Sequence, residues 1–263
     1  MNQDNIDIKD YSEKYLKEHG KTLSFERVLA EVRKTQILKS LNEYKHEHIL
    51  EVGCGLDPLF LYCDYISYTI VEPSDRFVQR ARELAAGKGN INIIQGYMEE
   101  ACQKLCKLAH GFDFIILSSL LHEVPLPEKL LQSVYQVCKS DTVVHINVPN
   151  VYSFHRLLAY EMGHIASIFE KSETEAKFQR HTRFDKQLLC ETVEESGFKI
   201  LSYGTYFIKP FANRQMEAIV AQNIVDKDVI KGLERMIKYM PDLGSEMYVE
   251  VKRDLPESSQ SSG

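Results

Sequence analysis

A glycine-containing turn after a short buried strand constrains the fold of this chain more than any other feature. The apolar run at 48–52 leads into Gly53 and Gly55 within the segment ILEVGCGLDP. Glycine has no Cβ, so the backbone can turn sharply from strand to helix and approach a ligand closely. The segment therefore predicts the first strand of an α/β sheet with a ligand-binding turn at its carboxyl end.

Strand-like and helix-like segments alternate after this turn. Uninterrupted apolar runs separated by amphipathic helices are typical of a parallel sheet that is covered on both faces. Alternating polarity near the end of the chain predicts one antiparallel strand inserted in that sheet. The expected strands are 68–72, 91–95, 112–118, 142–148, 198–207 and 246–251, and the expected helices are 74–87, 98–107, 126–139, 185–196 and helical material at 213–239.

Two helices are expected before the first strand, at 8–18 and 24–43. We interpret residues 1–46 as an N-terminal helical cap, which either covers the ligand site or forms the surface of a homodimer. One domain is expected over 47–255, with a helical insertion at about 150–184. The remaining residues, 256–263, have the low complexity of a disordered tail.

An acidic residue ends the second predicted strand, in the segment YTIVEPS. The Glu72 carboxylate can accept hydrogen bonds from both hydroxyl groups of a ribose, which an adenosine ligand requires. Together, the glycine turn and Glu72 indicate a nucleoside-binding site at the carboxyl ends of the first two strands.

Over residues 47–148 these motifs resemble the class I S-adenosylmethionine-dependent methyltransferases. The resemblance implies a Rossmann-like seven-stranded sheet, mostly parallel with one antiparallel strand and with helices on both faces. It also implies S-adenosylmethionine as cofactor and S-adenosylhomocysteine as product. The cofactor-binding residues that it implies are Glu51, Gly53, Cys54, Gly55, Asp57, Glu72, Pro73, Gly96, Tyr97, Met98, Ser118 and Ser119.

The chain departs from the family pattern after the third strand, where Tyr97 stands in place of the Asp that often accepts from the adenine amine. Backbone groups of Tyr97 and Met98, or the Glu99 side chain, are the alternatives for that contact. The Asn-Pro-Pro-aromatic motif of amide- and amine-methylating relatives is absent after the fourth strand, so DNA and protein-glutamine methylation are not expected.

A nicotinamide dinucleotide is the alternative ligand for such a turn. Its pyrophosphate needs a third glycine in the turn, and Pro58 occupies that position. Carboxylates at Glu51 and Asp57 would repel phosphate, whereas S-adenosylmethionine is cationic and has no phosphate. The motif thus favours the methyltransferase over an NAD-dependent oxidoreductase.

The charge, the apolar runs and the cysteines of the chain limit its expected binding partners and cellular compartment. The net charge is −6, so we expect no non-specific electrostatic binding of nucleic acid. No apolar run approaches ~18 residues, so no membrane span is expected. The six cysteines form neither a disulfide framework nor a metal-binding pattern, and we predict a cytoplasmic protein without a metal.

His122 is the candidate catalytic base. It follows the fourth strand, at the edge where ligands of parallel sheets bind, and a hydroxyl acceptor needs its proton removed. The alternative is a histidine that contacts the cofactor or only packs at the start of a helix.

Basic residues and imidazoles are concentrated in the irregular region after the fifth strand. Arginine suits the recognition of carboxylate or phosphate, so this region predicts a pocket for an anionic acceptor. The alternative is a solvated surface whose bases pair with Glu170, Glu173 and Glu175. The candidate substrate-binding residues are Asn150, Tyr152, His155, Arg156, His181 and Arg183.

These observations predict methyl transfer to a small molecule, with oxygen as the expected target. Residues 147–163 resemble bacterial small-molecule methyltransferases that are often associated with polysaccharides, which implies an anionic or sugar-like acceptor. A methyltransferase-like protein that binds the cofactor without catalysis is a further alternative.

Overall fold

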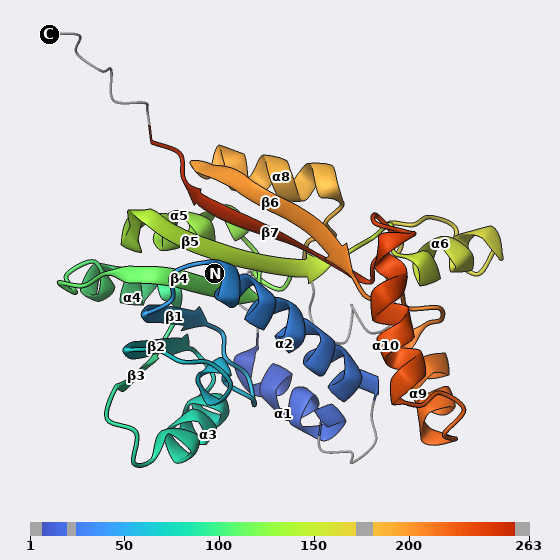
Figure 1. The fold of residues 1–263 in the computed structure, drawn as a ribbon, viewed down its shortest axis with the longest axis horizontal. Coiled ribbons are helices and arrows are strands. Elements are labelled where there is room, and N and C mark those ends of the chain that lie inside the picture. Colours follow the sequence, from blue (N-terminus) through green and yellow to red (C-terminus); the bar gives the residue numbers. More distant parts are fainter. Residues whose placement is uncertain (1–6, 20–24, 172–180, 256–263) are drawn as a thin grey trace, which may run out of the picture.

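A seven-stranded sheet forms the centre of the molecule, in the order β3-β2-β1-β4-β5-β7-β6 (Figure 1). The computed structural model describes residues 7–19, 25–171 and 181–255. β7 runs antiparallel to β5 and β6, and the pairs among β1 to β5 are parallel, which confirms the predicted fold class. The strands are β1 His48–Val52, β2 Ser67–Glu72, β3 Ile91–Gln95, β4 Phe112–Ser118, β5 Cys138–Pro149, β6 Phe198–Tyr206 and β7 Glu246–Arg253.

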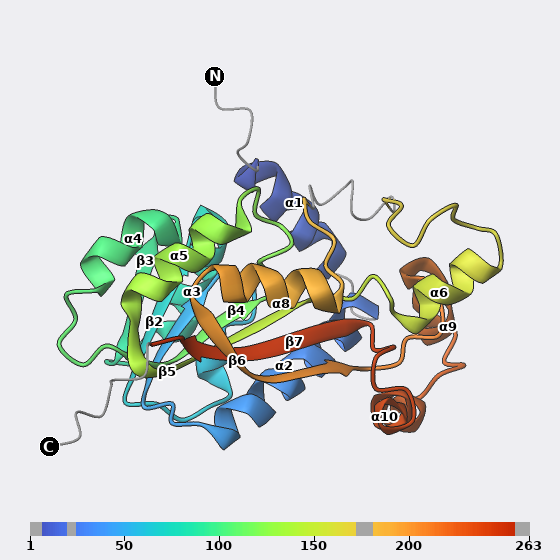
Figure 2. The ribbon, with the colours of Figure 1, turned by 90° about the horizontal axis from the view of Figure 1, so that it is seen from above.

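Helices cover both faces of the sheet, as Figure 2 shows for α5 and α8 on one side and α2 on the other. The first core cluster joins α4, α5 and α8 to the sheet, and the second joins α2 and α3 to it. The helices are α1 Ile8–His19, α2 Phe25–Glu43, α3 Asp75–Ala85, α4 Met98–Leu105, α5 Pro127–Val137, α6 Phe154–Glu161, α8 Lys186–Glu195, α9 Asn213–Ala221 and α10 Lys227–Arg235.

This double cover explains the apolar strands. All residues of β4 except the last are buried, because helices lie over both faces of this central strand. Edge strand β3 is only partly buried, and polar Asn92 and Gln95 are exposed there. Within the described ranges, no helix combines the length and the apolar character needed to cross a membrane.

Besides shifts of one or two residues at the ends of other elements, two parts of the fold differ from the sequence prediction. β5 begins at Cys138 rather than 142, because an irregularity between Phe112 and Phe114 lets Cys138 pair with β4 before the regular ladder begins. The turn after β1 leads not into an α-helix but into the 3₁₀ helix η1 (Leu59–Leu61), since the chain re-enters the sheet at Ser67. Residues 172–180 of the predicted insertion and the predicted tail 256–263 lie outside the described residues.

The elements beyond the carboxyl end of β5 come from distant parts of the chain. Figure 1 shows α6, α9 and α10 gathered at that end of the sheet. The amino-terminal part of α2 reaches the same region, where Phe25 and Leu29 pack with Phe207 and Met216. The elements that surround a ligand at this edge are therefore held by packing between segments far apart in sequence.

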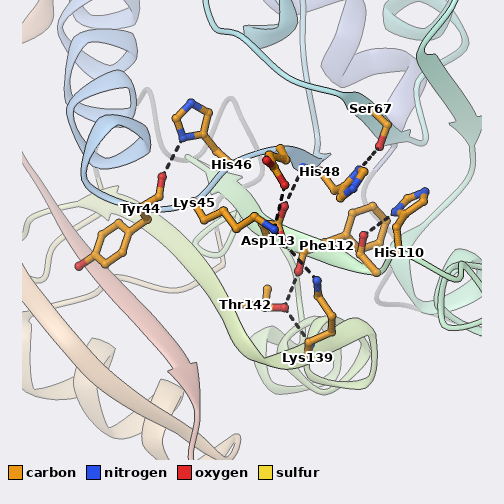
Figure 3. A network of polar contacts seen from close by, with 12 residues as sticks. Tyr44, Lys45, His46, His48, Ser67, His110, Phe112, Asp113, Lys139 and Thr142 are labelled. Atoms are coloured by element: carbon orange, nitrogen blue, oxygen red, sulfur yellow. Dashed lines mark hydrogen bonds and ion pairs between the residues drawn. The ribbon is translucent and has the colours of Figure 1, made fainter.

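A buried carboxylate, Asp113 at the start of β4, holds the chain together at the amino-terminal ends of the parallel strands (Figure 3). It accepts hydrogen bonds from the His48 N–H at 3.0 Å and from the Lys139 ammonium at 3.1 Å, and Lys45 pairs with it at 3.4 Å. Burial would raise the pKa of Asp113, but Lys139, the His48 N–H and Lys45 together lower it. Glu47, His48 and Asp113 could offer ligand atoms to a metal. Because two lysines already neutralise Asp113, we assign this group a structural role.

Asp113→Asn is expected to lower the free energy of unfolding by about 1–3 kcal/mol at neutral pH, because it removes a buried charged acceptor. The contribution of a carboxylate with a lowered pKa is present above its ordinary pKa, and it disappears as the pH falls through the lowered value. Urea unfolding at several pH values measures this difference. Asp141→Asn, at an exposed position of β5, is the matched control.

Candidate functional site

Two glycines with positive φ shape the turn after β1. Gly53 has a φ of 77° and Gly55 a φ of 56°, a left-handed conformation that other residues rarely adopt. The Gly53 N–H donates to the Val71 carbonyl of β2 at 2.9 Å, which holds the turn against the neighbouring strand. At these two glycines the turn therefore presents only backbone atoms to the space above it.

Glu51 supports this turn from below. Its carboxylate accepts hydrogen bonds from the Tyr68 hydroxyl at 2.8 Å and from the Leu59 N–H at 3.2 Å. Burial raises the pKa of Glu51 to about 8, and these two hydrogen bonds limit the rise. Glu51 thus joins the turn to β2 and to η1.

Glu72 connects the carboxyl ends of β1 and β2. One carboxylate oxygen accepts from the Ser74 N–H at 2.8 Å, and the other accepts from the Gly55 N–H at 3.4 Å. Burial raises the pKa of Glu72 to about 7, although the backbone hydrogen bonds lower it in part. This carboxylate is in place to accept further hydrogen bonds from a ligand with hydroxyl groups.

The end of β4 contributes a strained residue, Ser119, whose φ is 53°. Its N–H donates to the Asn147 carbonyl of β5 at 3.0 Å, which holds this conformation. Left-handed conformations outside glycine cluster at functional sites. Here the strained turn places Ser118 and Ser119 on the wall of a cavity.

This first cavity has a volume of about 260 Å³ and lies over the carboxyl ends of β1, β2 and β4. Every residue predicted from the resemblance to bind the cofactor lines it. These residues are Glu51, Gly53, Cys54, Gly55, Asp57, Glu72, Pro73, Gly96, Tyr97, Met98, Ser118 and Ser119.

The N-terminal helices complete the first cavity. Tyr11 and Tyr15 of α1 line it, as do Glu26 and Arg33 of α2. The Tyr15 hydroxyl lies 3.9 Å from where a Cβ on Gly55 would stand, so α1 covers the glycine turn. In the sequence, Tyr11 and Tyr15 showed only helical spacing, and that signal did not distinguish a cavity wall from core packing.

The charges around the first cavity suit a cationic ligand. The carboxylates of Glu72 and Asp57 line it. Of the cations in the lining, Arg33 is paired with Glu246, and Lys34 is paired with Glu31 at 2.8 Å and with Asp57 at 3.4 Å. Phosphate groups would face these carboxylates without a compensating cation from Lys34. The lining therefore fits a cationic ligand without phosphate groups, such as S-adenosylmethionine.

A second cavity of about 250 Å³ lies beside the first. The candidate base His122 lines it, and so do four of the six candidate acceptor-binding residues, which are Asn150, His155, Arg156 and Arg183. Tyr152 and His181 do not: the Tyr152 ring contacts Phe169, and His181 is exposed and uses its N–H to bond the His122 carbonyl. Their positions in an irregular segment carried no periodicity from which orientation could be predicted.

Asn150 lines the second cavity but also has a structural role. Its amide donates to the carbonyls of Asp242 and Gly244 at 3.0 Å, and its carbonyl accepts from the Tyr152 N–H at 2.9 Å. This residue therefore fixes the loop before β7 against the loop after β5.

Several cationic groups surround His155 in the second cavity. Burial, followed by the charges of Lys209 and Arg156, holds the pKa of His155 well below its ordinary value. His155 is therefore neutral at physiological pH, and in the described part of the chain its buried Nδ1 has no hydrogen-bond partner. Lys209, which is 7% exposed, was not identified in the sequence because it follows β6, far from the other residues.

Comparison with known proteins agrees with this geometry. Residues 24–203 match the family described as methyltransferase domain. The chain is similar in structure to the plantazolicin methyltransferase BamL, solved with a triazolic desmethyl analog and S-adenosylhomocysteine, with 15% identity, a TM-score of 0.57, and coverage of 94% of this chain and 91% of that one. No curated protein matches this sequence.

Two further solved structures have the same fold. One is a possible histamine N-methyltransferase from Thermotoga maritima, with 16% identity, a TM-score of 0.55, and coverage of 94% of this chain and 95% of that one. The other is a methyltransferase dependent on S-adenosylmethionine from Archaeoglobus fulgidus, with 15% identity, a TM-score of 0.53, and coverage of 85% and 94%.

Glu72→Gln is expected to weaken S-adenosylhomocysteine binding by about ten- to a hundredfold, because a neutral amide replaces the charged acceptor of the ribose hydroxyls. In the unchanged protein, affinity should fall as the pH drops from 8 to 6, since the Glu72 pKa is about 7 and a proton then occupies the acceptor. Calorimetry at both pH values measures this. Equal affinity of the variant would contradict the assignment, and Glu83→Gln, on an exposed position of α3, is the control.

Proposed function

The chain belongs to the methyltransferase-domain family and is an S-adenosylmethionine-dependent methyltransferase, and we propose that it methylates a small anionic molecule held in the second cavity. The observation that carries this proposal is the position of the second cavity. It adjoins the first cavity, and both are lined by Glu26 and Arg33. An acceptor in the second cavity would therefore lie next to the methyl group of the donor.

The charges of the second cavity support an anionic acceptor. Arg156, Arg183 and Lys209 line it together with the neutral His155. Arginine binds carboxylate and phosphate groups through paired hydrogen bonds, and a buried lysine adds a compact positive charge. Burial is the main reason for the low pKa of His155, and the charges of Lys209 and Arg156 lower it further, which is consistent with a positive potential in this cavity.

Small size of the acceptor is supported by the volume of the second cavity, about 250 Å³. Among the relatives, one was solved with a desmethyl plantazolicin analog and another is described as a possible histamine N-methyltransferase. We propose that the acceptor of this chain is a hydroxylated metabolite, such as a sugar-like or polysaccharide-related acid, that is methylated at oxygen.

His122 is the proposed base for this O-methylation. It follows β4, is 2% exposed and lines the second cavity, where its imidazole would accept the proton of the acceptor hydroxyl. Glu123 lies 3.6 Å from its Nε2 and would stabilise the resulting imidazolium. The bound donor supplies a methyl group on a good leaving group, so orientation by the two cavities accounts for much of the remaining catalysis.

Transfer of labelled methyl groups to a panel of small hydroxylated compounds tests the acceptor class. We expect methylation of hydroxy acids and sugar phosphates and little methylation of their neutral esters. Arg183→Met and Lys209→Met should each lower kcat/KM by about tenfold or more while S-adenosylhomocysteine affinity is retained. Lys199→Met, an exposed position of β6, is the control, and preference for neutral acceptors would contradict the proposal.

His122→Asn tests the base. It should lower kcat by about 10²–10⁴-fold without changing S-adenosylhomocysteine affinity, because general base catalysis contributes on that scale. The acidic limb of the pH profile for kcat should also disappear. An unchanged kcat with the same acceptor would show that His122 is not the base.

A further inference from the structure

One helix forms the wall shared by the two cavities. Glu26 and Arg33 of α2 both line the first cavity and the second. They are seven positions apart, about two helical turns, so they lie on the same side of α2. A group that passes from a donor in the first cavity to an acceptor in the second must pass near these two side chains.

The positive charge of Arg33 is compensated within the protein. Its guanidinium donates two hydrogen bonds to the Glu246 carboxylate at the start of β7. The same carboxylate accepts from the Tyr206 hydroxyl and, at 3.2 Å, from the Asn147 amide. Glu246 pairs so closely with Arg33 that together they add no net charge to the shared wall.

Glu26 is in a different position. Its carboxylate accepts one hydrogen bond, from the Asn213 amide at 2.5 Å, and the Asn213 carbonyl in turn accepts from the Lys209 ammonium at 2.6 Å. Across the described ranges, no lysine, arginine or histidine forms an ion pair with Glu26. The shared wall therefore carries a negative charge that no described basic side chain pairs.

We propose that the Glu26 carboxylate recognises the positive charge of the methyl donor at the junction of the two cavities, and so favours S-adenosylmethionine over its neutral product. This inference makes Glu26 a specificity-determining residue. It rests on the proposed function only in taking the second cavity as the acceptor site. Transfer of the methyl group from sulfur to the acceptor would leave a neutral thioether. The attraction to Glu26 would then end, which would promote release of the product.

Three ligands that differ in charge at the reacting position test this proposal. S-adenosylmethionine carries a sulfonium there, sinefungin carries an amine, and S-adenosylhomocysteine is neutral. Glu26→Gln should weaken the binding of the two cationic ligands by about tenfold, the effect of one moderate charge interaction, and leave S-adenosylhomocysteine affinity unchanged. Calorimetry of the full-length chain gives all three dissociation constants without any acceptor.

Matched variants separate this effect from general damage to the site. Glu43→Gln removes an exposed carboxylate at the far end of the same helix and should change none of the three affinities. Glu72→Gln should weaken all three equally, because the ribose is common to them. Glu26→Asp keeps the charge and should retain part of the preference for the cationic ligands.

The outcomes are distinct. If Glu26→Gln weakens all three ligands equally, or none of them, the charge-recognition role is overturned. Should that variant not fold, Glu26→Ser replaces it, since serine is well tolerated near the first turn of a helix. If this test fails, the methylation results with the panel of acceptors still stand. If that panel shows a preference for neutral acceptors, the proposed function is overturned, but the affinities for the three ligands are not changed.

Discussion

The buried Glu72 carboxylate determines how the two loops under the first cavity are placed relative to each other. β1 and β2 are adjacent parallel strands, so their carboxyl ends lie side by side. Hydrogen bonds from Gly55 and Ser74 to Glu72 tie the turn of one strand to the loop of the other. A buried carboxylate is costly unless its oxygens are satisfied, and these backbone groups satisfy it in part. A ligand with hydroxyl groups would complete the set, and its binding would then stabilise both loops.

Helix α2 links this ligand site to the core. Its second half is anchored by Ile37 and Leu41, which pack against the sheet, while its first half projects beyond the carboxyl ends of the strands. Arg33 adds a polar anchor through Glu246 of β7. The same helix therefore carries the side chains that line both cavities. The chain as a whole has a net charge of −6, yet Arg156, Arg183 and Lys209 are concentrated in the lining of the second cavity.

The site residues that could be predicted from the sequence lie at or just after the carboxyl ends of strands. Gly53, Gly55, Glu72 and Ser118 each end or directly follow a strand that the apolar pattern identified. Parallel strands bring their carboxyl ends to one edge, so residues at these ends converge without further information. The antiparallel β7 was likewise expected, from its alternating polarity, whereas the order of the strands was not predicted.

The sequence by itself determined the sheet, the glycine turn and the carboxylate at the end of β2, because each depends on local pattern. Only the tertiary structure decided that Tyr15, Glu26 and Lys209 face the cavities and that Tyr152 does not. These residues come from helices and irregular segments outside the parallel strands. Their orientation is fixed by packing between elements that are far apart in the chain, and that packing leaves no periodic signal in the sequence.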